Sequence, residues 1–185
     1  MKVLIIDNGT KHLRSLKKLL SAYEVNIFPF FSNYSNIEQY NLIVLSGGSK
    51  FAVTQNPEKF TGEIDLIKNS TIPIIGICEG CEVIAYVYGS KLKSFGPKIK
   101  GVKTIEIVDN TIIDSNGPIN VYEAHHWAIE KLGKDLIGVA KSQNGFEIIK
   151  HRQKPIYGLQ FHPEMFVDKT LGDEIFKQIV DRITK

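Results

Sequence analysis

A cysteine lies where a predicted strand meets a predicted helix. The isoleucine-rich run of residues 72–77 is typical of a strand buried on both faces, and residues 83–88 repeat apolar side chains at helical spacing. Only residues 76–80, with a glycine at each end, join the two, so Cys78 should project above the sheet on a tight turn. This is the geometry of a nucleophile elbow, although a buried structural cysteine would give the same pattern. We expect the positive end of the following helix to favour the thiolate.

The partners that a cysteine nucleophile requires occur at the ends of other predicted strands. His162 follows the strand of residues 156–160 and could act as the base, and Glu164 could hold the second ring nitrogen. A glycine pair, residues 47–48, follows the strand of residues 42–45 and offers backbone amides for an oxyanion. Because ligand sites in α/β sheets lie at the carboxyl ends of strands, we expect these groups to meet at one edge.

The first half of the chain alternates predicted strands with predicted helices. Strands are expected at residues 2–7, 23–28, 42–45 and 72–77, and helices at residues 13–20, at residues 63–68 and from the elbow to residue 89. This alternation favours an α/β fold with an open, mostly parallel central sheet and helices on both faces.

The second half changes to short predicted strands. They are expected at residues 91–95, 103–108, 119–123, 136–141, 146–151 and 156–160. Turn signals such as Gly96-Pro97 and Asn144-Gly145 separate several of them, so we predict an antiparallel meander, followed by a helix at residues 171–183. The chain contains no composition shift typical of a linker, and we expect residues 1–185 to form one domain.

Composition excludes several classes of function. Of 185 residues, 43% are hydrophobic and 23% are charged, which suits a globular domain with a sizeable core. No apolar run has the length of a membrane span or a signal peptide, and two cysteines three residues apart form no disulfide framework, so we expect a cytoplasmic protein. The net charge of +3 is spread along the chain and does not predict nucleic-acid binding.

Three motifs resemble those of class I (triad) glutamine amidotransferases. Residues 76–82, GICEGCE, resemble the elbow G-x-C-x-G-x-Q of that family. Residues 46–49, SGGS, resemble S-G-G-P, and residues 158–164, GLQFHPE, resemble G-x-Q-F-H-P-E. The resemblance covers nearly the whole chain and implies the family's flavodoxin-like fold.

The resemblance also implies an activity. In that family a cysteine attacks the side-chain amide of glutamine, ammonia leaves, and water releases glutamate from a glutamyl thioester. The ammonia passes to an ATP-dependent synthetase domain or subunit, and the glutaminase half needs no cofactor or metal. The implied catalytic set is Cys78 as nucleophile, His162 as base, Glu164 as its orienter, Gly48 in the oxyanion hole, and the amide of Gly80 or Cys81 as second oxyanion donor.

Within the family, the chain is most similar to the free-standing glutaminase subunit of two-subunit GMP synthetases. The similarity lies in the total length and in residues 150–162. Ala124-His125 matches a Ser-His pair that lines the glutamine pocket there. The implied substrate-binding residues are Gly47, Glu82, Ala124 and His125.

Several positions depart from the family pattern. Glu82 replaces a glutamine, and γ-glutamyl hydrolases, a sister branch, resemble this chain in carrying glutamate there. Trp127 stands where GMP synthetases usually have aspartate, and Ile99-Lys100-Gly101 replaces Glu-x-Gly. Two alternatives therefore remain open: a hydrolase of γ-glutamyl compounds, and a binding or regulatory module on the same scaffold. The intact Cys78 and His162 favour an enzyme.

Other residues are interpreted mainly as structure. Cys78 and Cys81 form a C-x-x-C pair, but a thioredoxin-like role would not require the His-Pro-Glu motif. We expect Cys81 to fill space, with a redox pair as the alternative. The run His125-His126-Trp127 could bind a metal, but it lacks a third ligand at helical spacing, so a pocket wall is favoured. His12 is expected at the surface, and Asp7 in a turn.

Overall fold

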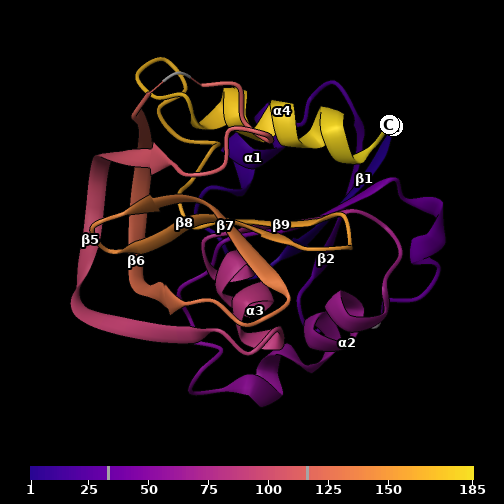
Figure 1. The fold of residues 1–185 in the computed structure, drawn as a ribbon. Helices are drawn as coiled ribbons and strands as arrows, with labels where there is room; N and C mark the ends of the chain where they lie inside the picture. The colour runs from indigo at the N-terminus through magenta and orange to yellow at the C-terminus, as the bar shows by residue number, and fades with distance from the viewer. Residues whose placement is uncertain (33, 116) are drawn as a thin grey trace.

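The computed structural model describes residues 1–32, 34–115 and 117–185. Within these residues nine strands form one sheet in the order β2-β1-β3-β4-β9-β8-β6-β5-β7, with helices packed on two faces (Figure 1). Two short 3-10 helices in the same residues, η1 (Ile37–Gln39) and η2 (Pro57–Phe60), interrupt the longer connections.

Five strands make the parallel half of the sheet in the described part of the chain. They are β1 (Lys2–Asp7), β2 (Glu24–Pro29), β3 (Leu42–Leu45), β4 (Ile74–Ile77) and β9 (Ile156–Leu159), and each runs parallel to its neighbours in this group. The central strands β3, β4 and β9 are buried throughout, as their continuous apolar sequences predict. The predicted parallel sheet of the first half is therefore confirmed. The carboxyl ends of β3, β4 and β9 lie side by side.

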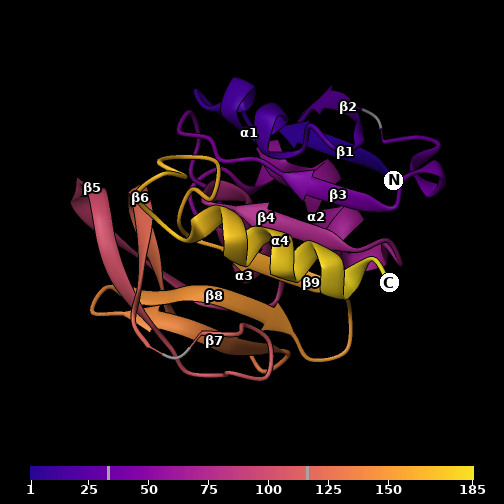
Figure 2. The same ribbon diagram turned by 90° about the horizontal axis from the view of Figure 1, so that it is seen from above.

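Helices cover both faces of the parallel half. α1 (Leu13–Leu19) and α4 (Gly172–Ile183) lie on one face, and α2 (Thr61–Asn69) and α3 (Glu79–Val87) lie on the other (Figures 1 and 2). Alternation along the strands divides the core accordingly: Val3 packs in the cluster that includes Leu16 of α1, whereas Leu4 packs in the cluster that includes Leu66 of α2. Cys78 belongs to the first cluster and Cys81 to the second.

The second half is closed, and in this respect the prediction of an open sheet with a simple meander was wrong. Its strands are β5 (Lys91–Ile107), β6 (Ile119–Lys131), β7 (Leu136–Ser142) and β8 (Gly145–His151). β5 pairs with β6 and β7, and β8 pairs with β6, β7 and β9, all antiparallel. These strands therefore return on themselves as a small barrel, whose β8 edge continues the main sheet through β9. Closure removes the edges that an open meander would expose.

The bounds of β5 differ from those of the two strands predicted in this region. The predicted strands at residues 91–95 and 103–108 are parts of one strand, and Gly96-Pro97 forms no hairpin. β6 runs along both parts, with a register shift between Ser94 and Ile99 where Gly96 has a φ of 71°. The turn signal therefore produces an irregularity inside the strand, because the partner strand is long enough to pair on both sides of it.

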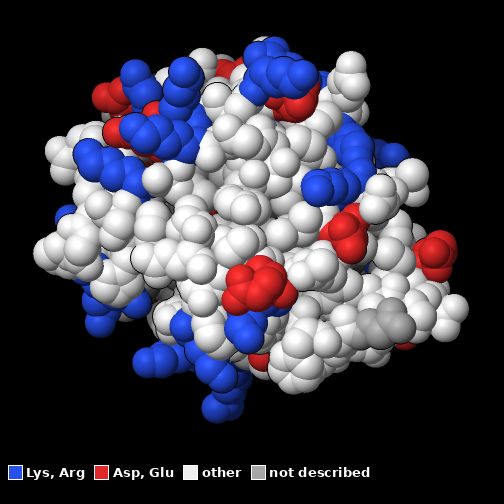
Figure 3. All heavy atoms as spheres, turned by 90° about the horizontal axis from the view of Figure 1, so that it is seen from below, with Lys and Arg blue, Asp and Glu red and all other residues white. Residues whose placement is uncertain are grey.

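Charged side chains of both signs are distributed around the face formed by α2 and α3. Figure 3 shows Lys and Arg in separate groups, most of them toward the margin, and a group of Asp or Glu near the centre among uncharged side chains. Such a distribution differs from the continuous basic stripe of many nucleic-acid-binding proteins. Among the residues that the structure describes, no helix has the length and apolar composition needed to span a membrane.

Candidate active site

The junction of β4 and α3 has the backbone of a nucleophile elbow. Cys78 lies there with φ 52° and ψ −106°, a conformation that is strained for a residue with a side chain. A Cβ on Gly76 would overlap the carbonyl oxygen of Gly80. A Cβ on Gly80 would lie 2.5 Å from the carbonyl oxygen of Leu45. The two glycines are therefore required for the close approach of α3 to the strands, as the sequence predicts.

His162 and Glu164 form the second part of the site, just beyond β9. His162 Nδ1 lies 2.8 Å from Glu164 Oε1, and both side chains are at most 5% exposed. The hydrogen bond at Nδ1 leaves Nε2 as the nitrogen that can accept a proton. A Cβ on Gly47 would lie 3.0 Å from Cε1 of His162 and 3.4 Å from Cβ of Cys78, so the imidazole and the cysteine flank the same glycine. The structure thus brings the three predicted residues together.

The environment of the thiol differs from the expectation. Burial raises the pKa of Cys78 well above its usual value, and the carboxyl groups of Glu82 and Glu79 raise it further. The backbone N–H of Glu79 opposes this rise in the pKa only partly. The direction of this shift contradicts the expectation that the helix N-terminus favours the thiolate: burial and the neighbouring carboxyl groups favour the neutral thiol of Cys78. Formation of the thiolate then requires proton transfer to a nearby base.

The glycine loop after β3 is tied to the end of β1. Asn8 donates from its backbone N–H to Ser46 Oγ at 2.9 Å and from Nδ2 to the carbonyl oxygen of Ser46 at 3.0 Å. Asp7 accepts from the amides of Gly9 and Thr10, which confirms its predicted role in a turn. The bonds from Asn8 fix the backbone just before the predicted oxyanion residue Gly48.

The first turn of α3 supplies further donors. The amide of Glu82 donates to the carbonyl of Cys78, so the amides of Glu79, Gly80 and Cys81 precede the first intrahelical hydrogen bond. Gly80 and Cys81 were the expected second donors, and that assignment stays a prediction. The backbone N–H of Glu79, which the sequence interpretation overlooked, is the group that acts to lower the pKa of Cys78. An N–H immediately after the nucleophile is the expected place for such a donor.

A cavity of about 220 Å³ opens beside Cys78. The predicted residues Gly48, Glu82, Ala124 and His125 all line it, and Lys98 of β5 contributes a cation to its lining. No sequence signal pointed to Lys98, since the irregularity that brings it here lies inside β5. A larger cavity of about 520 Å³ lies beside α2 and contains none of the triad residues. The smaller cavity is therefore the candidate substrate site.

Glu82 is buried in the wall of this cavity. Its Oε1 accepts a hydrogen bond from Gln160 Nε2 at 3.0 Å. Burial raises its pKa to about 7, although the bond from Gln160 and the charge of His125 oppose the shift. Glu82 therefore changes between its neutral and ionised forms near neutral pH.

Two further residues complete the surroundings of the triad. The ring of His12 is 5.2 Å from that of His162 in an edge-on contact, so His12 belongs to the site instead of the open surface where it was expected. Burial and the neighbouring His162 lower the pKa of His12. Cys81 is fully buried, and a Cβ on Gly158 would lie 2.6 Å from its Sγ. Cys81 thus packs against β9, as expected of a space-filling residue.

A buried carboxyl group behind the site gives a prediction about stability. Glu63 of α2 is fully buried, and burial raises its pKa from 4.5 to about 8. Between these values the folded protein keeps a proton that the unfolded chain has released, so stability decreases as the pH rises. We expect Glu63→Gln to reduce the loss in unfolding free energy between pH 5 and 8 by on the order of 3 kcal/mol. Urea denaturation of both proteins at the two pH values measures this, and equal losses would contradict it.

Comparison with known proteins decides the family. A family model described as glutamine amidotransferase class-I matches residues 4–182. The chain belongs to the class-I glutamine amidotransferase family. The family prediction made from the three motifs is therefore confirmed, and with it an enzyme family that uses a cysteine nucleophile.

Several GMP synthases are similar to this amidotransferase. It is 31% identical over 170 residues to a glutamine-hydrolyzing GMP synthase subunit from Pyrococcus abyssi, covering 88% of this chain and 89% of that protein. It is 30% identical over 183 residues to the corresponding subunit from Methanocaldococcus jannaschii, and the match covers 95% of this chain and 94% of that subunit. The GMP synthase of Spiroplasma kunkelii is 26% identical, and the chain spans 36% of its length.

Solved structures support the fold of the amidotransferase. A protein from Thermoplasma acidophilum superposes with a TM-score of 0.87 at 25% identity, covering 99% of this chain and 94% of that one. A glutamine amidotransferase from Thermotoga maritima superposes with a TM-score of 0.79 at 17% identity, and the superposition covers 100% of this chain and 98% of that one. The class I amidotransferase fold is thus shared along the whole chain.

Proposed function

We propose that residues 1–185 form a single amidotransferase domain that hydrolyses glutamine to glutamate and ammonia. The ammonia passes to a separate ATP-dependent synthetase, most similar to that of the two-subunit GMP synthetases. The observation that carries the proposal is the buried His162–Glu164 pair, 2.8 Å apart, beside the strained elbow of Cys78. Both free cysteines accord with a cytoplasmic location.

The triad divides the reaction into two steps. In the first, Nε2 of His162 takes the thiol proton while Cys78 Sγ attacks the side-chain carbonyl carbon of glutamine. The proton then passes to the amide nitrogen, the C–N bond breaks, and ammonia leaves behind a glutamyl thioester. In the second, His162 takes a proton from water, hydroxide attacks the thioester, and the returning proton restores the thiol. Glu164 holds the ring and stabilises the imidazolium in both steps.

The oxyanion of each tetrahedral intermediate needs backbone donors. Gly48, from the loop after β3, is the proposed first donor. The second comes from the first turn of α3, where Glu79, Gly80 and Cys81 have amides without an intrahelical acceptor. The positive end of α3 favours the negative charge there, because the oxyanion is an anion at a helix N-terminus.

The amino-acid end of glutamine is assigned to the cavity wall. The proposed contacts come from Gly47, Ala124 and His125, with Glu82 accepting from the α-ammonium group. An ionised Glu82 would repel the α-carboxylate, whereas Lys98 in the lining offers that carboxylate a cation.

Glu82→Gln tests this assignment. Above pH 7 Glu82 is largely ionised, because its pKa is about 7, and the substitution removes the repulsion of the carboxylate. We expect the KM for glutamine at pH 8 to decrease about tenfold, which corresponds to roughly 1.4 kcal/mol. The decrease should be smaller at pH 6, where Glu82 already carries a proton. Steady-state kinetics at both pH values measure this, and an unchanged or higher KM at pH 8 would refute the account.

The partner is expected to control the rate. Asn8 fixes the loop only up to Ser46, and Ser49 and Lys50 are exposed, so we expect a synthetase to complete the position of Gly48. Glutaminase activity should then rise by about tenfold or more when an ATP-dependent GMP synthetase subunit is added. Glutamate and ammonia release, measured with and without the synthetase, test the proposal. Absence of glutamate release under both conditions would overturn it.

A second candidate function is hydrolysis of γ-glutamyl compounds. The observation that favours it is Glu82, a buried carboxyl group in the cavity wall where the amidotransferase motif has glutamine. Such a hydrolase would use the same thioester chemistry but would need no partner. Full activity toward γ-glutamyl peptides in the isolated protein, unchanged by a synthetase, would select this function.

A further inference from the structure

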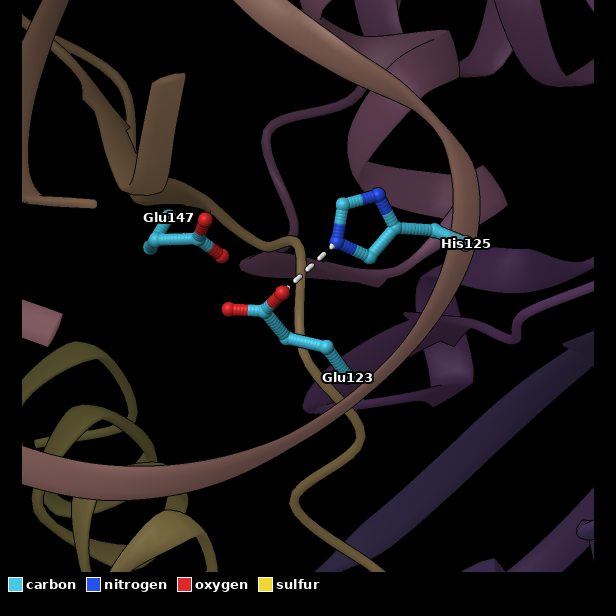
Figure 4. A group of neighbouring side chains, drawn as sticks. All are labelled: Glu123, His125 and Glu147. Carbon is cyan, nitrogen blue, oxygen red and sulfur yellow. Dashed lines mark hydrogen bonds and ion pairs between the residues drawn. The ribbon is translucent and has the colours of Figure 1, made fainter. Parts of the chain in front are cut away.

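Three buried side chains converge inside the barrel half. Glu123 and His125 lie on β6 and Glu147 lies on β8, and Figure 4 shows their polar atoms pointing toward one another. One ligand atom from each lies within 4.8 Å of the others, and His125 Nε2 is 3.3 Å from Glu123 Oε2. Both glutamates are 0% exposed, and His125 is 2% exposed. Together the three residues form what we call the barrel cluster.

The imidazole of the barrel cluster is held in a defined orientation. His125 Nδ1 lies 2.6 Å from the carbonyl oxygen of Trp127, which can only accept, so Nδ1 donates. Nε2 is then the nitrogen that faces the carboxylates. A metal-binding histidine characteristically donates its other N–H to a backbone carbonyl, which fixes the tautomer and directs the ligand nitrogen.

The carboxylates have unused hydrogen-bonding capacity. Glu123 Oε1 and Glu147 Oε2 are buried, and neither has a hydrogen-bond partner within the described residues. Ser142 Oγ donates to the other oxygen of Glu147 at 2.7 Å and so orients that carboxylate. Buried acceptors without partners are costly, and two ionised carboxylates carry more negative charge than a single imidazolium balances.

We propose that Glu123, His125 and Glu147 bind a divalent first-row transition-metal ion. One imidazole nitrogen and two carboxylate oxygens are a ligand set that suits Zn²⁺, Co²⁺ or Mn²⁺. In a tetrahedral site with bonds of about 2.0–2.2 Å, ligand atoms are about 3.4 Å apart, close to the spacing of His125 and Glu123. The ligand oxygen of Glu147 lies within 4.8 Å of the other two ligand atoms, so its side chain would move closer to the ion, and we expect a water molecule to complete the coordination.

The ion would have a structural role. It would join β6 to β8, which share one paired position among the described residues, Ile129 with Phe146. It would also fix His125, which forms part of the wall of the cavity beside Cys78. Because the ion binds only the folded protein, the melting temperature should rise with metal concentration.

Spectroscopic titration of the metal-stripped full chain with Co²⁺ tests the proposal. We expect one saturable site with the visible bands of four- or five-coordinate Co²⁺ and no thiolate charge-transfer band, and displacement of Co²⁺ by Zn²⁺. Glu123→Gln and Glu147→Gln keep the side-chain volume and should each weaken binding by at least about tenfold. The matched control is Glu63→Gln, which changes another fully buried carboxyl group and should leave binding unchanged.

Two further measurements establish that the variants are folded and which atoms bind the metal. Circular dichroism of each variant establishes that it is folded, and X-ray absorption of the Zn²⁺-loaded protein should give nitrogen and oxygen neighbours without sulfur. Saturable binding that survives both Glu123→Gln and Glu147→Gln would overturn the proposal. So would a complete lack of binding, which would leave the barrel cluster as an imidazolium–carboxylate pair only.

Discussion

Replacing Cys78 with serine should reduce kcat for glutamine hydrolysis by a factor of about 10⁴ or more. The serine hydroxyl can occupy the same space on the elbow, so the fold should persist. It is a far weaker nucleophile than a thiolate, because a hydroxyl group gives up its proton much less readily than a thiol. Glutamate release at saturating glutamine, with an added GMP synthetase subunit, measures the loss, and thermal unfolding confirms that the variant is folded.

The double variant Cys78→Ser/His162→Ala tests whether the two residues act together as one catalytic unit or contribute independently to the rate. His162→Ala should also lose most of the activity, and adding it to Cys78→Ser should cost little more, since residues that act as one unit have non-additive effects. Turnover at the wild-type rate in Cys78→Ala would remove the nucleophile from the account.

Gly48→Ala should lower kcat by a factor of about 10² to 10³ with little effect on KM. The new Cβ would overlap Oε2 of Glu79 and would lie 2.5 Å from the carbonyl oxygen of Asn8. The glutamate side chain can move, but the backbone of Asn8 is held by its bonds to Ser46. The loop must therefore shift, and the amide of Gly48 loses its position toward the developing oxyanion.

Gly117→Ala is the matched control. A Cβ at Gly117 would have no atom of the described residues within 4 Å, so this variant should keep the wild-type kcat and unfolding temperature. If Gly48→Ala retained wild-type kcat, the proposed oxyanion hole would be wrong. If it lost kcat only in proportion to the folded fraction, the effect would be one of stability.

The parallel half of the fold could be predicted because its signals are local. Continuous runs such as residues 42–45 and 74–77 are typical of strands buried on both faces, and the elbow glycines are needed for close backbone contact. The barrel could not be predicted, because its closure depends on pairing between β5 and β7 and between β6 and β8, which are far apart in sequence. A turn signal at Gly96-Pro97 cannot distinguish a hairpin from an irregular strand.

The meeting of Cys78, His162 and Glu164 could be predicted for a similar reason, since each of these residues follows a strand end. The pKa shift of Cys78 could not be predicted, because it depends on how side chains from different elements pack around the thiol. The buried carboxyl groups of Glu79 and Glu82 oppose the thiolate at Cys78, and their burial is decided by packing. The position of Glu147 could not be predicted either, because packing places this residue of β8 next to the Glu123–His125 pair of β6.

The proposed function depends above all on the formation of a glutamyl thioester at Cys78. It is tested by mixing the protein and an ATP-dependent GMP synthetase subunit with ¹³C-labelled glutamine, quenching with acid during turnover, and mapping the label by peptide mass spectrometry. We expect a labelled glutamyl adduct on Cys78 of the wild-type protein and no adduct in His162→Ala. Label on Cys81, or sustained glutamate release without any adduct on Cys78, would contradict it.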